Sequence, residues 1–592
     1  LAWTLGQAEE FKMPVRVLDC DVEEPNCHLF LRGNYGDPQP VHAEKPEFDL
    51  KKCIGCGRCA NKCRYNAIAM VKGTPLVFND MCHSCGVCAA VCPHDAIKMK
   101  PLPIGEILSD LSMKPFSFAW GRLRVGESQS PMVISQLQKL AQPEAITLLD
   151  GPPGTACSAV KTISAADRVI LVTEPTPFGA HDLKLALNLC NELNKPCAVF
   201  INRSDENDSI IEQLATVHSV PVVGKIPFSR EYARACCEGL ILAAEFPTLR
   251  GEIINSFSRM VNEAKVPLRH EEAEATASGA AAPPTNGGAK SNNYQEITIL
   301  SGKGGTGKTS VAGAFSDLAE SRVFADCDVD AANLKLLLQG KTLYRDRVSL
   351  GSLAKIDPFR CTKCNKCLEQ CRFGAVSRSP ETGAYQVEEM HCEGCGLCIE
   401  ICPARAISEK RAETGSLMVS EAAGATLIHA DLSTAAENSG KLVSMVRDLA
   451  FAVVEQQQKD WLISDGPPGT ACPAIAAVTG SDRVILVTEP SVAALHDLER
   501  VIKLVRHFGL LPEIVINKAD INGSVSRRIH EMADNKGYRV IGEIPFDEAI
   551  KQAIRAGMPV TRHNPESQAA KAIVNIWNQI KETRNENRNS GN

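Results

Sequence analysis

The chain contains an internal repeat that divides it into two related halves. The segment DGPPGTAC begins at Asp150 and again at Asp465, and DRVILVTEP begins at Asp167 and again at Asp482. Both pairs are 315 residues apart, and the shorter segment DCDV also occurs once in each half. A repeat of this length is a whole domain rather than one unit of a solenoid. The sequence therefore predicts two similar domains, as a chain too long for a single core requires.

Composition places the boundaries of these domains. A stretch at 268–293 is rich in Ala, Gly, Pro, Ser and Asn and is predicted to be a flexible linker. The first domain then spans 1–267 and the second spans 294–582, and the polar residues 583–592 are predicted to form a disordered tail.

A helix is predicted just before this tail. Ile573, Trp577 and Ile580 share one of its faces. Because the helix has no basic polar face, we expect it to dock on the second domain rather than lie on a membrane surface.

Charge and hydropathy exclude several classes of protein. The net charge of -6 provides no basic footprint for nucleic acid. No apolar run is long enough for membrane insertion, and the start LAWTLGQAEEFK does not have the pattern of a signal peptide. In a long chain of this kind, 25 cysteines indicate metal or cluster binding and a reducing, cytoplasmic location.

The second half opens with a phosphate-binding pattern. A β-branched strand, the loop SGKGGTGKT and a helix follow one another, so the loop N–H groups and the helix dipole converge on phosphate. Lys308 is predicted to reach the β- and γ-phosphates of ATP and Thr309 to bind Mg²⁺. The other residues predicted to line this loop are Gly302, Gly304, Gly305, Gly307 and Ser310.

The additional loop lysine, Lys303, is similar to the signature lysine of the MinD/ParA family of P-loop ATPases, which includes the nitrogenase iron protein and Mrp-type cluster carriers. The resemblance implies two doubly wound, mostly parallel α/β domains that face each other as an internal pseudo-dimer. It also implies that Lys303 reaches across a dimer to the partner's ATP and acts in catalysis together with Lys308.

Four further segments resemble motifs of this family. ADCDVDAANL is similar to switch I, so Asp328 is expected to position the attacking water. LISDGPPGTACP is similar to Walker B and switch II, which places Asp465 near Mg²⁺. In VINKAD, Asn517 is expected to contact the adenine, and Pro545 and Asp547 of IPFD are expected to close over it.

The first half departs from this pattern. It keeps a degenerate set, Asp21, Asp150 and Asn202, but shows no glycine-rich loop. Aligned on the repeat, Leu1 corresponds to about Val311, so the first strand and the phosphate loop are the missing pieces. We expect an N-terminal truncation of this domain, and the alternative is a genuine pseudo-ATPase half.

Each half carries two cysteine quartets with the spacing C-x₂-C-x₂-C-x₃-C. This is the spacing of two-cluster bacterial ferredoxins, in which the fourth cysteine of each quartet ligates the other cluster. Four [4Fe–4S] clusters are therefore predicted, in α+β inserts at about 45–102 and about 353–410. The expected ligand sets are Cys53, Cys56, Cys59 with Cys92; Cys82, Cys85, Cys88 with Cys63; Cys361, Cys364, Cys367 with Cys402; and Cys392, Cys395, Cys398 with Cys371.

Two details of the inserts bear on function. Each insert lies between the segments similar to switch I and switch II, which move when γ-phosphate is lost. In addition, Cys63 and Cys371 are followed by Arg rather than the usual Pro, which is expected to alter local hydrogen bonding.

Cys157 and Cys472 lie seven residues after Asp150 and Asp465, a spacing at which the nitrogenase iron protein has a cluster ligand. Two interpretations stand, a cluster bridging the halves or small packed thiols, and we favour packed thiols.

Three functions remain open. The first hypothesis is an ATPase that drives low-potential electron transfer to a partner redox enzyme. The second is an iron–sulfur cluster assembly or carrier ATPase, although neither half has the Cys-x-x-Cys near the domain end that such carriers usually show. The third is a positioning ATPase, which the lack of a basic patch and of a membrane helix disfavours.

Overall fold

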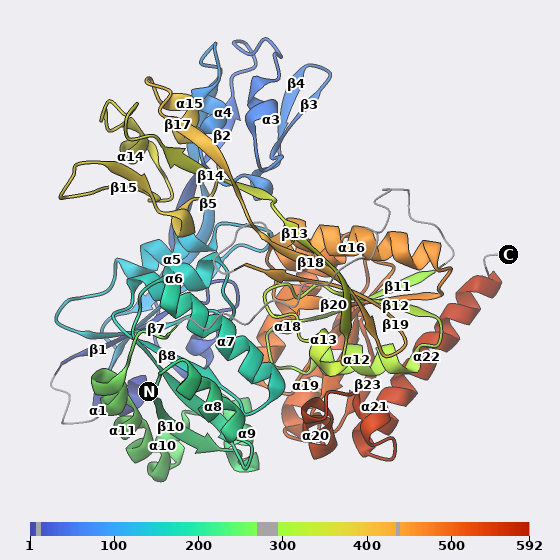
Figure 1. Ribbon diagram of the computed structural model, residues 1–592. Coiled ribbons are helices and arrows are strands. Elements are labelled where there is room, and N and C mark those ends of the chain that lie inside the picture. Colours follow the sequence, from blue (N-terminus) through green and yellow to red (C-terminus); the bar gives the residue numbers. More distant parts are fainter. Residues whose placement is uncertain (8–12, 269–293, 434–438, 591–592) are drawn as a thin grey trace.

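The computed structural model describes residues 1–7, 13–268, 294–433 and 439–590. The predicted linker falls almost entirely outside these residues. Within the described ranges, no helix combines the length and the hydropathy needed to cross a bilayer. Figure 1 shows two α/β bodies below a pair of small modules.

The second half is built on a nine-stranded sheet in the order β13-β18-β19-β12-β20-β11-β21-β22-β23. The seven strands from β19 to β23 in this order are parallel, and β13 and β18 are antiparallel additions. The strands are β11 (Gln295–Ser301), β12 (Arg322–Asp326), β13 (Lys341–Val348), β18 (Gly415–Ala422), β19 (Ala425–Leu432), β20 (Trp461–Pro468), β21 (Arg483–Thr488), β22 (Glu513–Asn517) and β23 (Arg539–Ile544).

Helices cover both faces of this sheet. One apolar core joins the sheet to α16 to α19, and the other joins it to α12, α20 and α22. The helices are α12 (Lys308–Leu318), α13 (Leu334–Leu337), α16 (Ser439–Gln456), α17 (Cys472–Val478), α18 (Val492–His507), α19 (Gly523–Lys536), α20 (Glu548–Arg555), α21 (Val560–His563) and α22 (Gln568–Ser590). The mixed α/β class with a parallel sheet, predicted from the sequence, is thus confirmed.

Helix α22 docks on the second half, as the sequence predicts. Ile573, Trp577 and Ile580 are buried in the core beneath it. The helix continues to Ser590, whereas the sequence analysis expects a disordered tail from 583 onward. Arg584 extends the docking, because its guanidinium lies 4.2 Å from the Trp461 ring centroid and 3.3 Å from Asp460.

The first half has two sheets in place of one, in the orders β2-β5-β6-β1-β7 and β10-β9-β8. The strands are β1 (Val15–Asp19), β2 (Gln39–Phe48), β5 (Ile97–Asp110), β6 (Ser117–Leu123), β7 (Ile146–Asp150), β8 (Val169–Thr173), β9 (Cys197–Ser204) and β10 (Val222–Pro227). The helices are α1 (Ala2–Gln7), α2 (Cys27–Phe30), α5 (Ser130–Gln138), α6 (Cys157–Ala165), α7 (Pro177–Glu192), α8 (Ser209–Val217), α9 (Arg230–Cys237), α10 (Leu242–Glu245) and α11 (Pro247–Glu263).

The gap between these two sheets matches the piece that the repeat predicts to be missing. In the second half, β11 pairs with both β20 and β21. The corresponding strands β7 and β8 belong to separate sheets, and the described first-half residues provide no strand between them. Most of β7 and β8 is partly solvent-exposed, and Val172 is 63% exposed, whereas β20 and β21 are almost entirely buried.

The two cysteine-rich modules lie side by side at the top of Figure 1, where α4 contacts α15. The first module contains α3 (Arg58–Lys62), β3 (Ile68–Val71), β4 (Thr74–Val77), η1 (Asn79–Met81) and α4 (Val87–Ala90). The second contains β14 (Gly351–Ile356), α14 (Lys366–Gln370), β15 (Val376–Arg378), β16 (Tyr385–Val387), η2 (Glu389–His391), α15 (Leu397–Ile401) and β17 (Ile407–Ala412).

Candidate functional site

The loop between β11 and α12 has the backbone that a phosphate cradle requires. Gly305 and Gly307 adopt positive φ values of 78° and 94°, which side chains disfavour. A Cβ at Gly302 would lie 2.7 Å from the Asp497 backbone, and one at Gly307 would lie 2.2 Å from Asn517 Nδ2. The backbone conformation therefore favours glycine at 305 and 307, and close packing requires glycine at 302 and 307.

Lys308 joins two of the predicted site carboxylates. Its Nζ donates to Asp465 Oδ1 at 2.8 Å and to Asp328 Oδ2 at 3.3 Å, and it lies 3.5 Å from Thr309 Oγ1. Burial raises the pKa of Asp328 to about 7, and the Asp465 charge adds to this shift although Lys308 opposes it. Four predicted site residues thus meet at one point.

This cluster fits a magnesium ion. Asp465 Oδ2 is buried and has no hydrogen-bond partner among the described residues. Carboxylate and hydroxyl oxygens are the donors that Mg²⁺ prefers, and Mg²⁺ is usually bound through one or two carboxylates together with substrate phosphates. Asp465, Asp328 and Thr309 supply such donors at the start of α12.

Lys303 forms its ion pair within its own half. Its Nζ is 3.1 Å from Glu489 Oε1, and Lys518 Nζ donates to the other oxygen of Glu489 at 3.0 Å. Burial opposes the charge of Lys303, but the Glu489 carboxylate holds its pKa above the usual range. Reaching across to a second nucleotide therefore requires Lys303 to leave Glu489.

The residues predicted around the base differ in role. Asn517 Nδ2 donates to Thr306 O at 2.8 Å, which ties this residue to the phosphate loop. Asp547 instead caps α20, because its Oδ1 accepts from Ala549 N at 2.9 Å and its Oδ2 from Ala569 N at 3.1 Å. Asn517 and Asp547 line the same large cavity as the loop, with Pro545 next in sequence to the lining residue Phe546.

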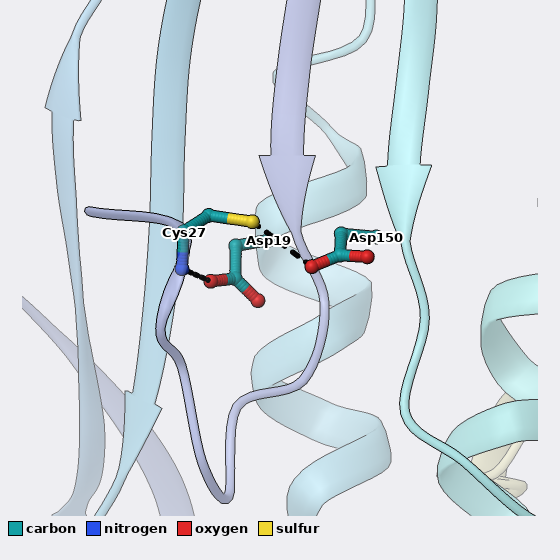
Figure 2. Close-up of side chains that lie close together, drawn as sticks. All are labelled: Asp19, Cys27 and Asp150. Atoms are coloured by element: carbon teal, nitrogen blue, oxygen red, sulfur yellow. Dashed lines mark hydrogen bonds between the residues drawn. The ribbon is translucent and has the colours of Figure 1, made fainter. Parts of the chain in front are cut away.

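In the first half, Asp19 and Asp150 lie at the corresponding strand ends and contact Cys27 (Figure 2). Cys27 Sγ donates to Asp150 Oδ2 at 2.9 Å, and Cys27 N donates to Asp19 Oδ2 at 3.0 Å. The ligand atoms of Asp19, Cys27 and Asp150 lie within 4.8 Å of one another. Asp150 thus accepts a hydrogen bond from a thiol, whereas the equivalent Asp465 accepts one from Lys308.

Asp21 and Asn202, the other two residues predicted for the first-half site, resemble their second-half counterparts Asp328 and Asn517. Burial raises the pKa of Asp21 to about 7, helped by Glu23 and Asp150. Asn202 Oδ1 accepts from Arg203 N at 3.0 Å, as Asn517 Oδ1 accepts from Lys518 N at 2.9 Å.

The four cysteine loops share one backbone conformation. In each, the residues two and four positions after the first cysteine have positive φ, at Gly55 and Gly57, Ser84 and Gly86, Lys363 and Asn365, and Gly394 and Gly396. The short helices α3, α4, α14 and α15 begin directly after these turns. The second module therefore repeats the loop geometry of the first.

Cys63 and Cys371, the last cysteines of the first quartet in each module, lie near the quartet that follows, as the ferredoxin spacing predicts. Burial raises the pKa of Cys88 to about 12, and Cys85, Cys82 and Cys63 add to the shift. In the second module, burial raises the pKa of Cys398 to about 12, and Cys392, Cys371 and Cys367 add to that shift. Cys63 and Cys371 thus join the trios that follow them, which fits the exchange of ligands between two clusters.

Cys157 and Cys472 begin α6 and α17 and line the same cavity as the phosphate loop. These positions are compatible both with a cluster that bridges the halves and with packed thiols, so each interpretation stays a prediction.

Two family comparisons match these sites. Residues 297–560 match the "CobQ/CobB/MinD/ParA nucleotide binding domain", and residues 47–99 match the "4Fe-4S dicluster domain". The second half is a CobQ/CobB/MinD/ParA nucleotide-binding domain. The chain also contains a 4Fe-4S dicluster domain in its first half, so the MinD/ParA and ferredoxin resemblances are confirmed.

Individual relatives extend this picture. An uncharacterized protein of Methanocaldococcus jannaschii is 29% identical over 48% of this chain and 96% of its own length. An iron-sulfur cluster carrier protein of Pyrococcus furiosus is 26% identical over 25% of this chain and 56% of its own length. The structure of MinD with Mg-ADP from Pyrococcus horikoshii is 18% identical, covers 49% of this chain and 97% of MinD, and has a TM-score of 0.30.

Sequence reasoning missed Glu489 and Lys518 as members of the nucleotide site. Glu489 lies inside the repeated DRVILVTEP segment, so the repeat itself contained the signal. In the first half, the matching Glu174 pairs with Arg203 at 3.0 Å.

Proposed function

We propose that this protein couples ATP binding and hydrolysis to low-potential electron transfer through four [4Fe–4S] clusters to a redox partner protein. The observation that carries this proposal is the continuity between cluster module and nucleotide-type fold. Strands β2 and β5 form one antiparallel ladder from Gln39↔Ile107 in the first-half sheet to Phe48↔Ile97 beside the cysteine loops, with one register shift between Val41 and His42. A shift of the sheet edge is therefore transmitted directly to the first module.

The nucleotide site supplies the source of such a shift. Asp465, Asp328 and Thr309 would hold Mg²⁺, and the ion would supply charge neutralisation at the phosphates. Lys308 would exchange its contacts with Asp465 and Asp328 for phosphate oxygens.

A second connection runs through α16. Its residue Gly440 packs against Cys472 of the switch-II-like segment, since a Cβ there would lie 3.3 Å from Cys472 Cβ. The next residue, Lys441, donates from Nζ to Arg64 O of the first module at 3.4 Å. Movement of the segment after Asp465 thus has a short route to the cluster ligand Cys63.

Contacts between the halves support an internal pseudo-dimer around the site. Phe228 and Phe546, at equivalent places in the two halves, stack with ring centroids 5.4 Å apart. Asn333 Nδ2 donates to Asp182 Oδ1 across the interface at 3.2 Å.

The test uses the full chain with its clusters reconstituted anaerobically. We expect MgATP to shift at least one cluster potential relative to MgADP, and dithionite reduction to change the ATPase rate. The Lys308→Ala variant should show neither effect while retaining its iron. The proposal fails if nucleotide leaves every potential unchanged and cluster reduction leaves the ATPase rate unchanged in the wild-type protein.

The second candidate is a cluster carrier, favoured by the similarity to the carrier protein of Pyrococcus furiosus. Incubation with an apo-ferredoxin and a chelator separates the two functions. Clusters that remain bound through redox cycles support electron transfer, and clusters that move to the acceptor faster with ATP support the carrier.

A further inference from the structure

The two cluster modules meet in a shared interface at α4 and α15. Val87, Val91 and Leu397 are buried together where α4 meets α15. Cys85 of the first module and Cys395 of the second pack against this apolar cluster and so face each other across the interface.

The arginines that replace the usual proline bind this interface in a reciprocal way. Arg64 follows Cys63 and extends to the second module, where its guanidinium donates to both carboxylate oxygens of Glu409 at 3.0 and 2.9 Å. Arg372 follows Cys371 and extends to the first module, where it donates to Ser84 O at 3.1 Å.

Each arginine covers the same position of the opposite module. A Cβ at Gly396 would lie 3.1 Å from Arg64 Nε, and a Cβ at Gly86 would lie 3.7 Å from Arg372 Nε. Gly86 and Gly396 directly follow the facing cysteines Cys85 and Cys395. The placement of each arginine over the opposite glycine is therefore pseudo-twofold, although the polar partners of the two arginines differ.

Side chains next to the first arginine reinforce the contact. Tyr65 stacks on His83 with ring centroids 3.8 Å apart and donates from its hydroxyl to Glu393 O at 2.9 Å. Lys62 pairs with Glu400 of the second module. Polar and charged contacts thus surround the apolar centre, as in a specific interface.

The facing cysteines belong to one cluster set in each module. Cys85 belongs to the set with Cys63, and Cys395 belongs to the set with Cys371; we call these the inner sets. Cys56 and Cys364, which belong to the remaining outer sets, are exposed at the surface. The order along the pair of modules is therefore outer, inner, inner, outer.

We infer that the two inner sets form an electron-transfer junction between the modules, and that Arg64 and Arg372 are its positioning residues. This inference rests on the proposed electron-transfer function. One electron leaves the reduced cluster of one module, which becomes oxidised, and reduces the oxidised cluster of the other module. No bond or proton changes place in this step, and an external low-potential donor supplies the electron.

The experiment isolates the inner clusters. In the full chain, Cys56→Ala and Cys364→Ala remove one ligand from each outer set, and iron analysis should then give two clusters per chain. After dithionite reduction, we expect electron paramagnetic resonance to show spin–spin interaction between the remaining clusters. Adding Arg64→Glu and Arg372→Glu should abolish that interaction with iron content unchanged.

Matched controls separate position from charge. Lys98→Glu and Arg378→Glu make the same charge change on exposed residues of the two modules and should preserve the interaction. Glu409→Arg combined with Arg64→Glu should restore part of it. Because the readout needs neither nucleotide nor partner, it can fail independently of ATP coupling.

Two outcomes overturn the junction. One is a spectrum of the inner-only protein that is the sum of two isolated centres. The other is a Cys85–Cys395 disulfide found by mass spectrometry in the cluster-loaded protein, because a disulfide would remove both thiolates from ligation.

Discussion

Lys308 is the residue on which the nucleotide site depends, because it is the ion-pair partner of two buried carboxylates. It contacts Asp465 and Asp328 within 3.3 Å and is itself buried. Lys308→Ala should weaken MgATP binding roughly 10- to 100-fold, because a hydrogen bond to a charged group contributes about 1.5–3 kcal/mol, and should lower ATPase activity at least as much. Isothermal titration calorimetry measures the affinity.

The matched control for this change is Lys536→Ala, which removes an exposed lysine paired with Glu499 on the protein surface. Its affinity for MgATP should equal that of the wild type. Unchanged binding by Lys308→Ala would show that the loop does not hold phosphate through this lysine.

His429 gives the second half a defined acid sensitivity. Burial lowers its pKa to about 3, with Lys335 and Arg345 adding to the shift, and its Nε2 lies 2.8 Å from Ser420 Oγ. The unfolded chain takes up a proton near pH 6.5 whereas the folded chain does not. The contribution of neutral His429 to the free energy of unfolding is therefore fully present well above pH 6.5. At pH 5 the free energy of unfolding is lower by about 2 kcal/mol, because the unfolded chain is protonated there.

His429→Gln should remove this pH dependence. Thermal unfolding between pH 5 and pH 7.5 should show a smaller decrease of the midpoint for the variant than for the wild type. His42→Gln, at an exposed position of β2, should follow the wild-type curve. Parallel curves for His429→Gln and wild type would contradict the role of His429.

At the scale of elements, local patterns and long-range contacts differ in how far the sequence predicts them. The phosphate loop is encoded by glycines and the cysteine loops by cysteines at fixed spacing, so their positions follow from local rules. The break between β7 and β8 follows from comparing the repeats. The contact of α4 with α15 joins positions about 300 residues apart, and no local signal marks Arg64 or Arg372 as interface residues beyond the absent proline.

The start of α16 is the element through which the nucleotide site touches the first module. Lys441→Ala removes the hydrogen bond to Arg64 O and leaves the phosphate loop intact. We expect normal ATP affinity and iron content but a smaller nucleotide-induced shift of the first-module potentials. Protein-film voltammetry with MgATP and MgADP measures this shift.

The control for that prediction is Lys459→Ala, at a position beyond the far end of α16. It should leave the nucleotide-induced shift at its wild-type size. A full shift in Lys441→Ala would exclude α16 as the connection and favour the β2–β5 ladder.

At the scale of the molecule, the sequence predicts two halves but not which side chains join them. Phe228 and Phe546 come from equivalent IPF segments, so their stacking follows the repeat. The ion pairs beside these rings do not follow the repeat, because Lys551 and Arg555 of α20 both contact Asp205 of the first half. This cluster is asymmetric and could be found only once the halves are placed together.

Asp205 therefore offers a test of the assembly of the halves. Burial opposes its charge, but Lys551 and neighbouring hydrogen bonds lower the pKa of Asp205 to about 2, so it is ionised at neutral pH. Asp205→Arg places three positive charges together and should weaken the contact by about 1–3 kcal/mol. Small-angle scattering should then show a larger radius of gyration, and MgATP affinity should fall.

Charge reversal on the other side completes the test. Lys551→Glu with Arg555→Glu should also open the contact, and combining both with Asp205→Arg should recover compactness because opposite charges meet again. Glu206→Arg is the control, since Glu206 is 83% exposed and lies 3.6 Å from Arg555, where a pair contributes little. If the triple variant is no more compact than Asp205→Arg, the halves are held by the stacked phenylalanines and not by this charge cluster.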